Sequence, residues 1–138
     1  MLLPPFHHQD LGKLLLRLTC GGLLFFHGFH KVFVEVDHVK RMVADAGLPP
    51  VLAYGNIVGE FVAPLFVIVG FRTRIGALII IFNMLMSIVI AHRDIAFRLN
   101  DFGGWMIETN VLYMMTAAVI FLLGSGKYSL SRGKGMWD

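Results

Sequence analysis

The sequence is poor in charged residues, and this shortage is its most informative feature. Only 15% of its 138 residues are Asp, Glu, Lys or Arg, whereas 57% are hydrophobic. Soluble domains carry about 25% charged residues, and their helices need a polar face toward water. Whole stretches of this chain lack such a face, and the mean hydropathy is +0.72. These features exclude an ordinary soluble domain.

Further absences exclude other classes of protein. The single cysteine, Cys20, cannot form an intrachain disulfide or a CxxC site. There is no HExxH motif, phosphate-binding loop or dinucleotide fingerprint. The net charge of +3 does not predict nucleic-acid binding, because the basic residues stand at the ends of apolar stretches. The N-terminal segment lacks an early basic region and a cleavage site, so we interpret it as a retained first helix.

Four apolar stretches are each long enough to cross a bilayer as a helix of roughly 20 residues. We expect spans at about 11–33, 51–70, 75–92 and 104–123. Between the first two, apolar residues at helical spacing alternate with charges, which predicts a short amphipathic helix at the membrane interface over residues 34–46. The sequence thus predicts an all-α membrane protein with one domain, 1–138. Its fold is a four-transmembrane-helix bundle with an amphipathic interfacial helix between helices 1 and 2.

The distribution of Lys and Arg predicts the orientation of a multi-pass membrane protein. Six basic residues fall on the side of the termini: Lys13, Arg72, Arg74, Lys127, Arg132 and Lys134. Five fall on the other side: Lys31, Lys40, Arg41, Arg93 and Arg98. This small excess favours a cytoplasmic location for both termini.

Polar side chains within the expected spans gather at one level of the bundle. A charged side chain inside a span costs about 2.5–3.5 kcal/mol, so each one needs a partner or a function. At a rise of about 1.5 Å per residue, polar groups from four helices lie in the half of the membrane away from the termini. They are His27, Lys31, Asn56, His92, Glu108 and Asn110, with Glu60 and Asn83 nearer the midplane. This convergence predicts a shared binding site or a polar network.

Helical geometry predicts that only part of this set faces one point. In regular helices His92 points away from Asn83, and Asn110 lies on a different face from Glu108. Pro64 cannot donate a hydrogen bond to the carbonyl of Glu60, so we expect a kink and a free acceptor beside that carboxyl group.

Structural roles compete with the functional ones. Glu60 could pair with Arg17 or Asn83 merely to hold the bundle together, so Arg17 and Asn83 are assigned as structural polar residues. His27 could be a packing residue, and Lys31 and His92 could extend to lipid headgroups. No ligand cluster supports a metal site, and we predict none; a haem between His27 and His92 is disfavoured but left open.

Several ordered segments resemble the DoxX family. They are HGFHKVF near the end of the first span, AGLPPVLAY entering the second, Gly59-Glu60, VGFRTRIGAL, and LLGSGKYSL after the fourth. The resemblance extends from about residue 11 to residue 130. It implies a small four-helix protein of the bacterial inner membrane, linked to quinone-coupled sulfur or thiol oxidation and to oxidative stress. Compared position by position, the resemblance implies that the functional residues are His27, Lys31, Glu60, His92 and Glu108.

The leading hypothesis is a membrane subunit of an oxidoreductase that binds a quinone between its helices. The expected ligand-binding residues are His27, Lys31, Asn56, Glu60, His92 and Glu108. No catalytic residue is assigned, but Glu60 and Glu108 are candidates for proton transfer. The chain has no obvious electron carrier, so a redox partner protein or bound cofactor is expected to supply electrons.

Two other functions fit the sequence. One is a non-enzymatic membrane scaffold that recruits a redox enzyme, and the other is a small-solute or proton transporter. A surface of small residues, Gly55, Gly59 and Ala63, could pack within the bundle or between the protomers of a homo-oligomer.

Overall fold

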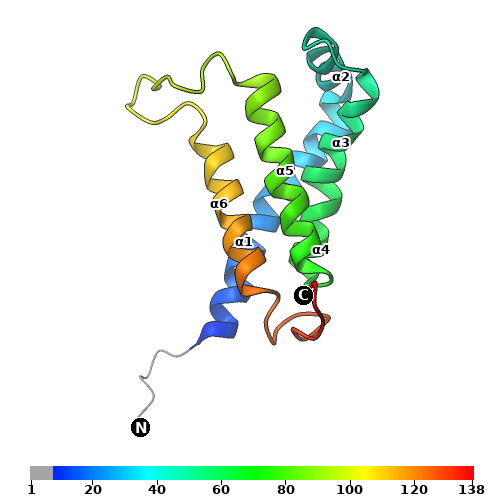
Figure 1. Ribbon diagram of the computed structural model, residues 1–138, viewed down its shortest axis with the longest axis vertical. Helices are drawn as coiled ribbons and strands as arrows, with labels where there is room; N and C mark the ends of the chain where they lie inside the picture. Colours follow the sequence, from blue (N-terminus) through cyan, green and yellow to red (C-terminus); the bar gives the residue numbers. More distant parts are fainter. Residues whose placement is uncertain (1–7) are drawn as a thin grey trace.

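A computed structural model describes residues 8–138. The predicted domain, 1–138, and the predicted retained N-terminal segment both include residues 1–7, which lie outside the described residues. The described chain is helical and contains no β-strand; one isolated bridge pairs Leu99 with Trp105. The prediction of an all-helical fold is therefore confirmed over this range. The long helices run side by side along the long axis of the molecule (Figure 1).

The first helical segment is longer than the expected span. Helix α1 (Gln9–His30) continues directly into a π-helical segment, η1 (Lys31–Glu35), and then into α2 (Val36–Asp45). Glu35, with φ −120° and ψ 10°, interrupts the regular backbone before α2. The predicted amphipathic segment is thus joined to the first helix without a loop. The ammonium group of Lys40 on α2 lies 5.1 Å from the centre of the Tyr54 ring, which connects α2 to the next helical segment.

The second helical segment, Pro50–Val69, contains four elements. They are the 3₁₀ turn η2 (Pro50–Leu52), α3 (Ala53–Ile57), the π-helical segment η3 (Val58–Val62) and α4 (Ala63–Val69). Gly70, with φ +76°, ends it in the left-handed conformation that glycine adopts without strain. A short turn then leads to α5 (Thr73–Ala91).

The last helix, α6 (Glu108–Leu123), begins four residues later than the expected span at 104. The side-chain oxygen of Asn100 accepts hydrogen bonds from the backbone N–H groups of Phe102 and Gly104, at 3.0 and 2.8 Å. These bonds hold the chain in a turn and delay the start of the helix, as Asn side chains often do.

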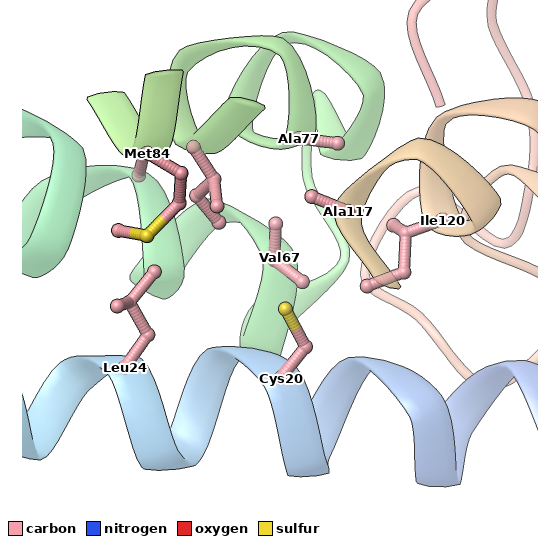
Figure 2. Close-up of a cluster of buried hydrophobic side chains, with 9 residues drawn as sticks. Cys20, Leu24, Val67, Ala77, Met84, Ala117 and Ile120 are labelled. Atoms are coloured by element: carbon pink, nitrogen blue, oxygen red, sulfur yellow. The ribbon is translucent and has the colours of Figure 1, made fainter. Parts of the chain in front are cut away.

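The buried core lies between α1, α4, α5 and α6. Figure 2 shows Cys20 and Leu24 of α1 pointing toward Val67 and Met84, with Ala117 and Ile120 of α6 closing the cluster. Three alanines of this core, Ala63, Ala77 and Ala117, are fully buried. Small side chains at these positions let the helices approach closely.

Two helical segments are long and apolar enough to cross a membrane, judged by length and composition. They are Pro50–Val69 and Thr73–Ala91, with mean hydropathies of 1.8 and 2.2. Helix α6 is also apolar, but it has only 16 residues. Helix α1 has 22 residues, and its apolar character is interrupted by Lys13, Arg17, His27 and His30.

Candidate functional site

A cavity of about 190 Å³ lies among the helices at the level where polar residues gather. It receives side chains from α1, η1, η3, α5 and α6, together with His92 just after α5. The lining residues are Leu24, His27, Lys31, Glu60, Met84, Ser87, His92, Thr109, Asn110 and Tyr113. Segments far apart in the sequence thus contribute polar groups to one space.

The central contact of the cavity is an ion pair between Lys31 and Glu60. Their Nζ and Oε1 atoms lie 2.7 Å apart, and the Glu60 side chain is only 4% exposed. Asn83 donates a second hydrogen bond to the same carboxylate oxygen, at 3.4 Å. A buried carboxylate needs such partners, because its desolvation is costly. The other oxygen of Glu60, Oε2, is buried and has no hydrogen-bond partner among the described residues.

The backbone around Glu60 explains how its side chain enters the cavity. Pro64 has no N–H group to bond the Glu60 carbonyl, and the N–H of Ala63 bonds the carbonyl of Val58 in the wider π-helical pattern. The irregularity expected from Pro64 is therefore a π-helical turn that contains Glu60 itself. Such turns occur frequently at functional sites.

Helix α1 approaches the Glu60 backbone through a glycine. A Cβ atom built on Gly28 would lie 2.1 Å from the Glu60 carbonyl oxygen, which leaves no room for a side chain. On the opposite side of η3, a Cβ on Gly59 would lie 2.3–2.6 Å from atoms of the Asn83 side chain. These two glycines let α1 and α5 close around Glu60, with Lys31 and Asn83 within reach of its carboxyl group.

His92 reaches the cavity because the helix ends before it. Helix α5 stops at Ala91, and His92 adopts φ −126° and ψ 6°. Its Nδ1 lies 3.1 Å from the carbonyl oxygen of Ser87. His92 would point away from Asn83 only in a regular helix, which does not extend this far.

Both cavity histidines have their Nδ1 atoms engaged with backbone carbonyls. His27 Nδ1 lies 3.1 Å from the Leu23 carbonyl oxygen. His92 Nδ1 lies at the same distance, 3.1 Å, from the Ser87 carbonyl oxygen. A carbonyl oxygen only accepts hydrogen bonds, so these contacts place a proton on Nδ1 of each ring. In a neutral imidazole, the second nitrogen, Nε2, is then a hydrogen-bond acceptor.

Helix α6 contributes polar groups that sequence reasoning missed or placed elsewhere. The Asn110 amide donates to the Ser87 hydroxyl at 3.2 Å, and the Tyr113 ring lies edge-on to His27, with 6.0 Å between centroids. Tyr113 follows Thr109 by four residues and Asn110 by three, so its side chain lies beside both on the helix surface. That spacing was the available signal for adding Thr109 and Tyr113 to the site, while Ser87 stands four residues after Asn83 on α5.

Two predicted ligand-binding residues do not line this cavity. Glu108 is the first residue of α6 and is exposed, with its carboxylate next to Gly104. Asn56 is half-buried on α3. Neither residue belongs to the cavity lining, because the late start of α6 and the faces of the two helices direct them elsewhere.

The two predicted structural polar residues have different partners. Asn83 bonds Glu60. Arg17 is 1% exposed and donates instead to the backbone carbonyls of Tyr128 and Val67. It thereby attaches the C-terminal segment to α1 and α4, and makes no hydrogen bond with Glu60.

Comparisons with known proteins show the family to which this chain belongs. The DoxX family model matches residues 12–93, more than half of the chain, so the protein belongs to the DoxX family. It is also 27% identical over 116 residues to a Bacillus subtilis (strain 168) protein described as "Putative oxidoreductase CatD". That alignment covers 84% of this chain and 81% of the relative. No solved structure matches the chain significantly.

The matched family region includes His27, Lys31, Glu60 and His92, whereas the α6 side of the cavity lies beyond it. Within residues 8–138, no group of three or more His, Cys, Asp or Glu side chains is placed to hold a metal ion. The cavity therefore offers one ammonium group, one carboxylate, two imidazoles and several neutral polar groups.

Proposed function

We propose that this protein is a four-span subunit of the bacterial inner membrane that binds a quinone headgroup in the cavity and supports redox chemistry. The observation that carries the proposal is the buried Glu60, which lines the cavity, is paired with Lys31 and has a second carboxylate oxygen without a hydrogen-bond partner among the described residues. An ionisable pair at membrane depth is expensive and commonly marks a functional site.

The distribution of apolar side chains supports a membrane location for the bundle. Large apolar side chains cover the outside of the helices, including Phe26 at 71% exposure, Phe82 at 64% and Leu122 at 74%. The interior instead holds many small residues. Soluble proteins rarely expose such extensive apolar surface, whereas lipid accommodates it. We place all four long helical segments across the bilayer and α2 at its interface, with both termini in the cytoplasm.

The size of the cavity favours a ring-sized ligand group. Pockets that enclose drug-sized molecules measure roughly 300–1,000 Å³, whereas this cavity measures about 190 Å³. A quinone ring is small and flat, and its apolar tail could remain in the surrounding lipid. Leu24, Met84 and Tyr113 provide apolar surface for the ring.

The polar groups have complementary roles toward a quinone. The Lys31 ammonium can donate a hydrogen bond to a carbonyl oxygen, while Nε2 of a neutral His27 or His92 can accept one from a hydroxyl. Glu60 can hold or release a proton at its free oxygen, because neighbouring Lys31 and Asn83 both bond the other oxygen. The cavity residues can therefore form hydrogen bonds with both the oxidised quinone and the reduced quinol.

A bound quinone would supply two-electron redox chemistry, which the side chains of the cavity do not. Interconversion of quinone and quinol transfers two electrons and two protons, so the electrons require a redox partner protein or a second cofactor. The relative's description as an oxidoreductase supports this assignment. Lys31, Glu60 and the histidines bind and orient the ring and handle protons.

The proposal is tested by measuring quinone in the purified protein. Lipids are extracted from the wild-type protein, and quinone is quantified per mole of protein; thermal unfolding is then followed with and without added quinone. We expect a stoichiometric quinone and a rise in Tm. Glu60→Gln should reduce both, because it removes the ionisable oxygen at the cavity.

Glu108→Gln is the matched control. It makes the same chemical change at a carboxylate that does not line the cavity, so binding should be unchanged. Wild-type protein that contains no quinone and shows no quinone-induced Tm shift would contradict the proposal, and equal losses in both variants would show that the cavity is not the binding site.

A further inference from the structure

The connection between α5 and α6 carries the most exposed aromatic side chains of the described chain. Phe97 is 96% exposed and Phe102 is 97% exposed, and Leu99 between them is 68% exposed. In Figure 1 this connection extends sideways from the end of α5, across the long axis of the bundle, before it descends to α6. We call residues 93–107 the aromatic loop.

The aromatic loop has an ordered backbone. Leu99 and Trp105 form an antiparallel bridge, the Asn100 N–H donates to the Gly104 carbonyl at 2.7 Å, and the Met106 N–H donates to the Arg98 carbonyl at 3.0 Å. The Trp105 indole donates to the Ala96 carbonyl at 2.5 Å. Internal bonding of this kind lets irregular backbone lie in an environment poor in water.

The length of α6 indicates where the loop lies. Its 16 residues extend about 24 Å at 1.5 Å per residue, whereas the hydrocarbon core of a bilayer is about 30 Å thick. Helix α6 therefore cannot cross this core by itself if it stands upright. In Figure 1, α6 also begins below the level at which α5 ends. Apolar groups outside the helix must occupy the remaining depth, and the aromatic loop is directly joined to its first residue.

We propose that the aromatic loop lies in the lipid interface and inserts Phe97 and Phe102 into the bilayer, completing the membrane crossing of α6. Arg93 and Arg98 belong to the same loop and are exposed, so they can contact anionic headgroups while the aromatic rings lie deeper. Trp105 fits the same layer, since tryptophan is enriched at membrane interfaces. This inference depends on the proposed membrane embedding but not on quinone binding.

The position of a nitroxide label in vesicles tests the inference. The full-length protein, with Cys20 replaced by Ala, is labelled at Phe97→Cys or Phe102→Cys in phosphatidylethanolamine–phosphatidylglycerol vesicles. Electron paramagnetic resonance then compares the accessibility of each label to oxygen, which concentrates in lipid, and to a water-soluble nickel complex. We expect labels at both positions to be more accessible to oxygen than to nickel.

Two control positions separate the possible outcomes. Phe82→Cys, in the middle of α5, should report lipid, and Asp94→Cys, whose side chain in the same loop is 92% exposed, should report water. If the labels at 97 and 102 are as accessible to nickel as the label at 94, while the label at 82 is accessible mainly to oxygen, the insertion of the loop is overturned and the membrane embedding is not. A label at 82 that reports water would overturn the membrane embedding as well.

Immobilised labels at 97 and 102 that neither reagent reaches would indicate a protein contact, such as a second copy of the chain. That result would also overturn insertion into lipid.

Discussion

Lys31 Nζ lies 2.7 Å from Glu60 Oε1, and each of these residues belongs to a π-helical segment, η1 or η3. A π-helical turn is wider than an α-helical turn and changes the direction of the side chains that follow it. The only two π-helical segments among residues 8–138 thus each contribute one member of the ion pair. Local backbone irregularity and the polar cavity are parts of one arrangement.

Loss of the lysine should cost more stability than loss of the carboxylate charge. Lys31→Met leaves a buried carboxylate without its cation, and we expect the free energy of unfolding to fall by at most about 3 kcal/mol, because Lys31 is partly exposed. Glu60→Gln keeps the shape of the side chain and should cost less. Thermal unfolding in detergent would measure both changes.

The double variant Lys31→Met, Glu60→Gln provides the control for this pair. It removes both charges, so it should recover stability relative to Lys31→Met alone. A double variant whose loss equals the sum of the two single losses would mean that the ion pair is not coupled.

Gly28→Ala should destabilise the protein, because the new methyl group would overlap the Glu60 carbonyl oxygen, 2.1 Å away. We expect a loss of about 1–3 kcal/mol, typical of overpacking. Gly22→Ala is the matched control on the same helix, since a Cβ there meets nothing within 4 Å. Higher helix propensity should make Gly22→Ala neutral or stabilising by up to about 1 kcal/mol. Equal Tm values for the two variants would contradict the close contact of α1 with η3.

Arg17→Met should loosen the C-terminal segment without unfolding the bundle. Arg17 donates to the Tyr128 and Val67 carbonyls, and the neighbouring Leu130 N–H donates to the Val69 carbonyl at 3.1 Å. Hydrogen exchange at residues 128–132 should therefore accelerate, while exchange in α5 remains slow. Arg72→Met removes an exposed arginine just before α5. It should leave the hydrogen-exchange rates of residues 128–132 and of α5 unchanged. Unaltered exchange at residues 128–132 in Arg17→Met would refute this attachment.

His92→Ala should weaken quinone binding by up to about tenfold, the effect of losing one hydrogen bond of about 0.5–1.5 kcal/mol. Asn56→Ala removes another polar group proposed from the sequence, but one that does not line the cavity. It should leave the dissociation constant unchanged. Quinone titrations followed by thermal shift would measure both variants, and a larger loss in Asn56→Ala would place the binding site elsewhere.

Much of the cavity was predictable from the order of the residues. Polar groups at corresponding depths in several apolar segments predicted a convergence, and His27, Lys31, Glu60 and His92 do line one cavity. Pro64 predicted the irregular backbone at Glu60, because a missing N–H group has a fixed local consequence.

The position of two predicted site residues depended on where helices begin and end. His92 lines the cavity, and α5 ends at Ala91 just before it; Glu108, the first residue of α6, is exposed and lies outside the cavity. The partner of Glu60 also depended on packing, since Lys31, Arg17 and Asn83 were all chemically suitable. Helix ends and side-chain partners depend on contacts between distant segments, which periodicity along one segment does not contain.

The sequence by itself determined that this chain is helical and apolar, and that polar groups of several helices lie at one level of the bundle, because composition, helix length and proline chemistry are local properties. Only the tertiary structure decided that Lys31 pairs with Glu60 and that Asn110 and Tyr113 replace Asn56 and Glu108 at the cavity. The pairing of Lys31 with Glu60 depends on Gly28 and Gly59, where the absence of a side chain lets α1 and α5 approach η3 closely enough to enclose one carboxyl group.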